Sequence, residues 1–224
     1  MSFGLMNIAQ AAPPKNVMIV FEVTMGELKI GQGIDSLQHD SISYTLTSQI
    51  IPKGLASLFL DKIERTSKGL IAKTGLVPKY FSEQGNKKKG SSEANFDWEK
   101  EQITLVTKDG QQTLPLIAES GDQATLPYLF AFKKKLPNKS SIYITDGRRF
   151  KLYQYERKDD GVINTKVGVL KVAHFKKVVD NDNDNGRQFE FWLSHKHDLL
   201  PVKIRFVDKK GNVIESTVQT LTIN

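Results

Sequence analysis

The chain has 224 residues, of which 39% are hydrophobic and 25% charged, a balance typical of a soluble globular protein with a core of its own. It contains no cysteine, which excludes disulfides, thiolate metal sites and a cysteine nucleophile. The formal net charge of +7 favours anionic partners such as lipid headgroups, acidic glycans or nucleic acid, and no apolar run is long enough to cross a membrane as a helix.

The N-terminus has features of an export signal. Residues 3–12 are uncharged and mostly apolar or small, and Ala9-Gln10-Ala11 has the small-x-small form that a signal peptidase accepts. We therefore expect residues 1–11 to be the remnant of a secretory signal peptide, residues 12–224 to form a single β-rich domain, and the protein to be periplasmic. An ordinary N-terminal tail is the alternative. Export makes nucleic acid an unexpected partner.

The N-terminal half alternates apolar and polar residues in short runs, which predicts strands. The predicted strands are residues 16–24, 27–32, 41–51, 69–73, 79–82, 96–98 and 103–107. Leu55, Leu58 and Phe59 switch to helical spacing, which predicts a short helix or tight turn after Pro52-Lys53-Gly54. The polar residues 83–93 are expected to form a hairpin loop.

A second helix is predicted near the middle of the chain. Leu126, Leu129 and Phe130 are spaced for one helical face, and Asp122 or Thr125 can cap the start. Three lysines at residues 133–135 complement the helix dipole, so they have a structural explanation before any role in binding.

The C-terminal half is predicted to be a series of hairpins. Asp146-Gly147 is a strong two-residue turn, and residues 159–161 and 209–212 are further turns before a last strand at 213–223. One hairpin is especially clear, because two sets of residues each fall on one face of a strand: Phe189, Phe191 and Leu193, and then Val202, Ile204 and Phe206. The fold class is therefore mainly β, a curled antiparallel sheet or partial β-barrel of about ten strands with two short helices.

The order of several short motifs resembles a bacterial family of usually exported, β-rich domains, known as domain of unknown function 3108. The motifs are residues 67–70, 75–78, Phe96-Asp97-Trp98, the helix start at Asp122, Asp146-Gly147, residues 165–168, Trp192-Leu193 and residues 200–204. The resemblance extends from about Val20 to the C-terminus and departs from the family at residues 121–124. It implies a β-rich domain outside the cytoplasm and transfers no functional residue.

Two groups of residues suggest metal sites. Residues 180–186, DNDNDNG, resemble the first half of a calcium-binding loop, but the glycine comes one residue late and the final glutamate is missing, which favours a plain polar turn. His174, His195 and His197 would share one face if Asn185-Gly186 were a two-residue turn, and could then hold zinc. A turn around His195 and His197 would scatter them. The sequence therefore predicts no metal and no cofactor.

Two aromatic sets are candidate ligand contacts. Arg149, Lys151 and Tyr153 alternate along one strand face, where basic and aromatic side chains can hold a nucleotide or a glycan, although the solvent face of a basic protein has the same pattern. Trp98 and Trp192 are out of phase with the apolar residues of their strands, so they could line the concave face of the curled sheet as an apolar pocket. Burial as core aromatics is the alternative.

No catalytic signature is present, so the leading hypothesis is a non-enzymatic periplasmic binding or accessory protein. Its expected ligand is amphiphilic or anionic, and its candidate partners are a lipid, a glycan or another envelope protein. One rival hypothesis is an envelope hydrolase that uses Asp97 with His174 or His195. The other is a scaffold or assembly factor for other envelope proteins.

Overall fold

Strands form almost all of the regular structure in the computed structural model of the chain, which describes residues 13–85, 87, 89–133, 135–178 and 187–223. Within those residues, 15 strands form one sheet. They are β1 (Asn16–Met25), β2 (Leu28–His39), β3 (Ser43–Pro52), β4 (Ile63–Ala72), β5 (Gly75–Gln84), β6 (Ser92–Asp97), β7 (Gln102–Thr107), β8 (Gly110–Pro115), β9 (Ser120–Asp122), β10 (Lys139–Thr145), β11 (Phe150–Thr165), β12 (Gly168–Lys177), β13 (Gln188–Ser194), β14 (Pro201–Val207) and β15 (Val213–Ile223).

Three short 3-10 helices interrupt the strands: η1 (Gly54–Leu58), η2 (Leu126–Phe132) and η3 (His195–His197). No helix in this part of the chain is long and apolar enough to span a membrane. Residues 1–11, expected to be a signal remnant, lie outside the described residues, and so does the DNDNDNG segment at 180–186.

The sheet is built by local pairing. Its strand order is β8-β7-β6-β5-β4-β3-β2-β1-β15-β14-β13-β12-β11-β10-β9, so the first and last strands of the chain pair in the middle. All pairings are antiparallel except the short parallel pairing of β9 with β10. Tight turns such as Asp146-Gly147 explain this order, because they return each strand beside its predecessor.

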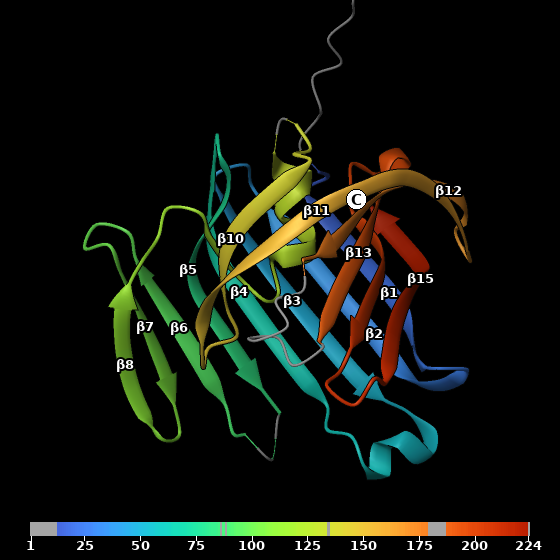
Figure 1. Cartoon of the computed structure of the whole chain (residues 1–224), viewed down its shortest axis with the longest axis horizontal. Coiled ribbons are helices and arrows are strands. Elements are labelled where there is room, and N and C mark those ends of the chain that lie inside the picture. Colours follow the sequence, from blue (N-terminus) through green and yellow to red (C-terminus); the bar gives the residue numbers. More distant parts are fainter. Residues whose placement is uncertain (1–12, 86, 88, 134, 179–186, 224) are drawn as a thin grey trace, which may run out of the picture.

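The sheet curls until one end meets the other flank (Figure 1). β9, the last strand of the order, packs against β5, while β6, β7 and β8 continue beyond that contact. β9 and β5 are not neighbours in the hydrogen-bonded order, so side chains rather than a backbone ladder close the curl. We call this contact the seam. It joins strands β9, β10 and β11 to strands β4, β5 and β6.

Polar side chains hold the seam together. The Ser67 hydroxyl donates to Asp122 Oδ2 at 2.5 Å, and the Ser92 hydroxyl donates to the Asp146 carbonyl at 3.1 Å. Gly147 is required beside this second contact, because its φ is +78° and a Cβ there would lie 2.5 Å from Ser92 Oγ. The hairpin turn between β10 and β11 is therefore fitted against β6.

An ion-pair triad extends the seam. The Glu83 carboxylate accepts hydrogen bonds from Arg65 Nε and Arg148 Nη1, each at 2.8 Å, and Arg148 Nη2 donates to the Gly90 carbonyl at 2.5 Å. Glu83 is buried, so its charge depends on both guanidinium groups for compensation. This triad joins β4, β5 and the β10–β11 turn.

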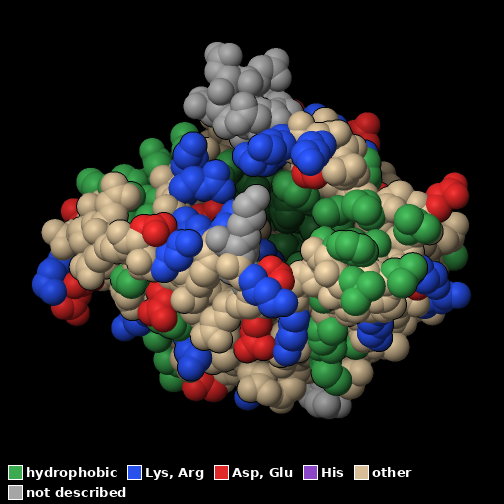
Figure 2. Space-filling view, turned by 90° about the horizontal axis from the view of Figure 1, so that it is seen from below, with side chains coloured by type: hydrophobic (Ala, Val, Ile, Leu, Met, Phe, Trp, Pro, Cys, Tyr) green, Lys and Arg blue, Asp and Glu red, His purple; other side chains and the backbone are tan. Residues whose placement is uncertain are grey.

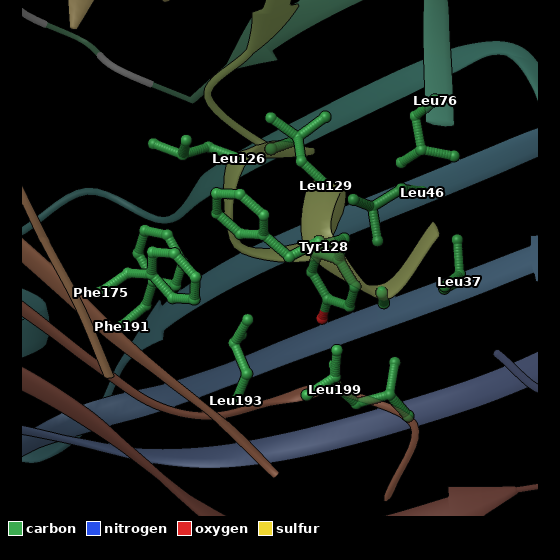
Figure 3. Close-up of a cluster of buried hydrophobic side chains, with 14 of the residues drawn as sticks. Leu37, Leu46, Leu76, Leu126, Tyr128, Leu129, Phe175, Phe191, Leu193 and Leu199 are labelled. Carbon is green, nitrogen blue, oxygen red and sulfur yellow. The ribbon is translucent and has the colours of Figure 1, made fainter. Parts of the chain in front are cut away.

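The core fills one half of the curled sheet. η2 enters the interior, and six of its residues, Leu126 to Ala131, are buried. Phe130 stacks on Phe175 at 4.2 Å between ring centroids, and Figure 3 shows Leu126, Tyr128 and Leu129 of η2 among side chains of the surrounding strands. Because η2 is apolar on nearly every side, it acts as an internal plug rather than a surface helix.

The mainly β, curled and unclosed architecture confirms the predicted fold class, but 15 strands replace the expected ten or so. The predicted pieces at 69–73 and 79–82 are the ends of two longer strands, β4 and β5. The predicted turn at 159–161 is wrong, because β11 continues through it with a bulge between Lys158 and Gly161. A bulge absorbs the extra residues without ending the ladder.

The two predicted helices are shorter and tighter than expected. The one after Gly54 is η1, which has no buried residue, and the one at Leu126 is η2. The carboxylate of Asp122 accepts the N–H groups of Ala124 and Thr125, so it caps the turn that leads into η2. The clear hairpin at 189–206 is confirmed as β13 and β14, whose residues Phe191, Leu193 and Val202 are fully buried.

The triad predicts a large loss of stability when its carboxylate is removed. Glu83→Ala leaves two partly buried guanidinium groups without their shared carboxylate, and we expect the free energy of unfolding to fall by about 3 kcal/mol. Urea unfolding measures the change. Asp97→Ala is the comparison variant, because it removes only an exposed pair with Lys100 and one turn hydrogen bond and should lower the unfolding midpoint far less. Equal losses in the two variants would contradict the role of the triad.

Candidate ligand-binding cavity

The interior below η2 is hollow. A cavity of about 450 Å³ lies between the curled strands and opens at the lower end of the molecule. Seen from below, Figure 2 shows a hollow with hydrophobic side chains inside and lysine and arginine side chains around its mouth. The volume falls within the range of small-molecule sites in proteins, about 300–1,000 Å³.

Strand alternation produces the apolar wall. On β14, Val202, Ile204 and Phe206 face inward; Val202 is buried, and the next two line the cavity. Neighbouring strands add aromatic and aliphatic side chains in the same way, and η2 forms the roof. The remaining apolar lining residues are Phe21, Ile50, Ile63, Ala124, Leu126, Pro127, Ile144, Tyr153, Tyr155, Phe189 and Ile214.

The charged lining residues are mainly basic. Five are cationic, namely Arg65, Lys89, Arg149, Lys177 and Arg187, whereas three are acidic, namely Asp35, Glu83 and Asp146. Glu83 pairs with Arg65, which is one of the five cations, and with Arg148, and Asp146 pairs with Arg149. Among the described lining residues, cationic side chains therefore outnumber acidic ones, which favours an anionic ligand.

Contacts near the mouth hold two of the basic groups in place. Arg149 Nη2 donates to Asp146 Oδ2 at 2.7 Å, and Lys177 Nζ lies 4.5 Å from the centre of the Tyr153 ring. Burial acts against ionisation of Asp146, but the Arg149 charge and hydrogen bonds outweigh it and lower the pKa of that carboxyl. Asp146 is thus an anchor for Arg149 rather than an acid for catalysis.

One acidic group lies in the apolar wall itself. Asp35 is buried, and its Oδ2 accepts a 2.6 Å hydrogen bond from the Tyr128 hydroxyl. Burial raises the pKa of Asp35, against the opposing effects of hydrogen bonds from Ser48 and Tyr128 and the charge of Arg65. The lining therefore contains a carboxyl group whose negative charge is disfavoured, in addition to the uncharged polar residues Ser48, Gln49, Gln123, Gln188 and Ser216.

Asp122 is a second buried acid, but it serves the seam. Burial is the main cause that raises its pKa to about 6, and the donors Ser67, Ala124 and Thr125 limit the rise. Perturbed acids often mark functional sites. Asp122 has no exposed surface, and Gln123 and Ala124, not Asp122, line the cavity. We therefore assign it to closure of the sheet.

The structure separates the residues expected to bind a ligand. Arg149 and Tyr153 line the cavity, whereas Lys151 is exposed outside its lining. Trp98 borders a different cavity of about 310 Å³, and its Nε1 donates to the Pro78 carbonyl at 2.7 Å. Trp192 contributes to neither cavity.

The structure does not bring Trp98 and Trp192 together on one concave face, although both are partly buried and pack against the core. Phe191 and Leu193 point into the curled sheet, so alternation turns Trp192 to the outer face, where it stacks on His174 at 4.3 Å. The sequence shows correctly that Trp192 lies on the opposite face of the strand from Phe191 and Leu193. The concave face of the sheet, however, is the one that carries Phe191 and Leu193.

The three-histidine arrangement does not form. His174 pairs across the ladder with Trp192 and binds Glu190 at 2.9 Å, instead of facing His197. His195 binds Asp160 at 2.9 Å, and His197 binds Ser194. Among the described residues, no group of three or more His, Asp or Glu side chains is placed to hold a metal ion.

The Asp97–histidine pair required by the hydrolase hypothesis is also not assembled. Asp97 ends β6 and binds Lys100 at 2.9 Å, while His174 and His195 have the acidic partners given above. Sequence reasoning missed several cavity residues, among them Phe21, Lys177 and Arg187, because they come from distant strands. The alternation of buried residues along β1 is a signal for Phe21, but the other two have no such signal.

Comparisons with known proteins agree with this fold. A family model described as "Protein of unknown function (DUF3108)" matches residues 20–219. No curated protein matches the chain. Among solved structures, the chain is similar to the crystal structure of a beta-barrel-like protein of domain of unknown function DUF1849 from Brucella abortus, with a TM-score of 0.60, 10% identity and coverage of 95% of this chain and 99% of that chain. This likeness shows the fold alone.

The pKa of Asp122 predicts a pH dependence of stability. Between its ordinary value of 3.8 and about 6, the folded chain holds a proton that the unfolded chain has released. The stability contributed by this proton is complete below pH 3.8 and is lost as the pH rises through about 6, by up to about 3 kcal/mol. Asp122→Asn should remove that slope.

Urea unfolding of both proteins at several pH values measures this difference. Asp35 titrates in wild type and variant alike, so its contribution cancels in the comparison. If the two proteins lost stability in parallel across this pH range, Asp122 would not be the group responsible.

Proposed function

The chain belongs to the DUF3108 family of proteins of unknown function, and we propose that it is a non-enzymatic binding protein of the bacterial envelope. Its ligand is an amphiphile with an anionic head and an apolar tail, held in the 450 Å³ cavity. The observation that carries this proposal is a cavity whose lining combines many apolar side chains with more basic than acidic ones, and which opens where Figure 2 shows lysine and arginine side chains. A membrane lipid or a lipid-linked envelope precursor has this chemistry.

The lining orients such a ligand. Phe21, Ile204 and Phe206 offer apolar surface but no strong donor or acceptor, so they favour a hydrocarbon tail over a sugar or nucleotide ring. Leu126 and Pro127 close the inner end, which places the tail against η2 and the head at the mouth. The tail gains from transfer out of water, and the head keeps partial contact with solvent.

The basic groups favour an anionic head over a neutral one. Arg187 lies at the start of β13 and Arg149 just before β11, and both line the cavity. An arginine guanidinium can donate two parallel hydrogen bonds to a carboxylate or phosphate, which adds geometric selectivity to the attraction of opposite charges. The Asp146 contact restricts Arg149 before a ligand arrives, which lowers the entropy lost on binding.

A periplasmic location is part of the proposal. It is supported by the signal-like residues 3–12 and is consistent with a chain free of cysteine. Native mass spectrometry of the protein recovered from the periplasm of an expressing bacterium tests ligand and location together. We expect a bound species that organic extraction releases, and that lipid analysis identifies as an anionic amphiphile. Recovery of the precursor uncut in the cytoplasm would contradict the location.

Blocking the cavity should abolish ligand binding. Ser216 lines the cavity on β15, whereas the next residue, Thr217, points to the opposite face of the sheet. We expect Ser216→Phe to weaken binding of a fluorescent fatty acid at least about tenfold, because the ring occupies space needed by the tail. Thr217→Phe is the matched control. Equal affinities in the two variants would place the ligand elsewhere.

Reversing a charge at the mouth should discriminate between head groups. We expect Arg187→Glu to weaken binding of dodecyl phosphate several-fold while leaving binding of dodecanol nearly unchanged, because only the first ligand is charged. Competition against the same fluorescent fatty acid provides the measurement. Lys210→Glu, an exposed change in the β14–β15 turn, is the control for net charge. A similar loss for both ligands would contradict an anionic head at this mouth.

A further inference from the structure

A cluster of exposed apolar side chains projects from the end of the molecule at which the cavity opens. Leu55 is 81% exposed, Leu58 73% and Phe59 85%, and Leu60 follows them. We call residues 53–62, which connect β3 to β4 and include η1, the tip. In η1 no residue is buried, so these side chains contribute nothing to the core of the described chain.

The geometry of η1 gathers these side chains on one projection. In a 3-10 helix, residues three apart lie on the same side, which places Leu55 beside Leu58. Phe59 ends the helix, and its N–H bonds the Ala56 carbonyl at 3.1 Å, so it follows directly on the same turn. Contiguous exposed apolar groups of this kind mark interaction sites in soluble proteins.

The tip is continuous with the cavity wall. Ile50 and Ile63 form the last pair of the β3–β4 ladder, and both line the cavity. Ile51 and Pro52 connect Ile50 to the tip, and Lys62 at the other end of the tip directly precedes Ile63, so the tip is attached to the cavity wall at both of its ends. η1 lies at the lower end of Figure 1, and Figure 2, viewed from below, shows hydrophobic side chains gathered beside the hollow.

The charges around the tip fit an anionic lipid surface. Lys53 and Lys62 flank the apolar residues in the chain; Asp61 between them is paired with Lys87, and Lys62 lies 3.8 Å from Glu64 in an exposed pair. The basic mouth of the cavity adds further positive charge on the same side. Apolar side chains that enter the acyl boundary, with lysines at the level of the headgroups, are the arrangement by which proteins bind the surface of a membrane.

We propose that the tip docks the protein on an anionic membrane surface, with Leu55, Leu58 and Phe59 inserted and the cavity mouth facing the lipid. Docking itself is independent of what the cavity holds. Its consequence, that an amphiphile passes between bilayer and chamber without crossing bulk water, rests on the proposed function. A bilayer suits the tip better than a folded partner, because separately projecting side chains need no complementary pocket to be buried.

Flotation with vesicles of phosphatidylethanolamine and phosphatidylglycerol tests the proposal. We expect the wild-type protein to float with the vesicles, and Leu58→Asp/Phe59→Asp to lower its partition coefficient at least about tenfold. Both substituted residues are exposed, so the variant should retain its fold. Ile42→Asp is the matched control, since Ile42 is 70% exposed in the turn at the opposite end of β3 and its substitution should leave flotation unchanged.

A reporter at the tip gives a second readout. Phe59→Trp should add fluorescence that shifts to shorter wavelength with these vesicles and is quenched by brominated lipid. Unquenched fluorescence from residue 59, or flotation that survives the double substitution, would overturn the proposal and assign any binding to the basic mouth. Uptake of dodecyl phosphate without flotation would overturn docking and leave the cavity function standing. Flotation that depends on the tip, without uptake of dodecyl phosphate, would support docking and overturn the proposed function of the cavity.

Discussion

The structure depends on the contact that closes its curled sheet. β9 and β5 share no backbone ladder, so closure relies on side chains, above all on Asp122, which accepts the Ser67 hydroxyl from β4 and the N–H groups that lead into η2. A buried carboxyl is stable only when its donors are in place. The same residue thus couples two distant strands to the entry of the internal helix. If the seam opened, the walls of the cavity would separate and η2 would lose the surface that covers it.

The division of the interior follows from η2. Its side chains fill one half of the curled sheet, where Phe130 stacks on Phe175, and Leu126 and Pro127 form the roof over the other half. One short segment therefore determines both the packing of the core and the depth of the cavity. A sheet of this size encloses more space than its own inward side chains occupy, so the part beyond the plug remains open.

The two ends of the molecule differ in chemistry, and this difference supports the proposed orientation of a ligand. The lower end combines a basic mouth with an apolar tip, and the ladder pair Ile50 and Ile63 joins the two. The second cavity, near Trp98, has no comparable charge excess; its lysine, Lys133, is paired with Glu119. An amphiphile has one charged and one apolar part. Of these two cavities, the lower one offers basic side chains for the charged part and an apolar lining for the tail.

The sequence by itself determined the mainly β class, the hairpin at Asp146-Gly147, the last strand and the inward face of the strands that carry Phe191 and Val202. Each depends on local alternation or turn chemistry, which needs no distant partner. It did not reveal β8, whose residues are nearly all exposed, or β9, three residues that pair in parallel with a later strand. Only the tertiary structure decided that the hairpin's apolar face is the concave one, that Trp192 lies outside, and that Phe21, Arg149 and Arg187 share a cavity. The physical reason is that curvature and closure are set by contacts between strands far apart in the chain, such as Ser67 with Asp122, and alternation distinguishes two faces without saying which one becomes the inside.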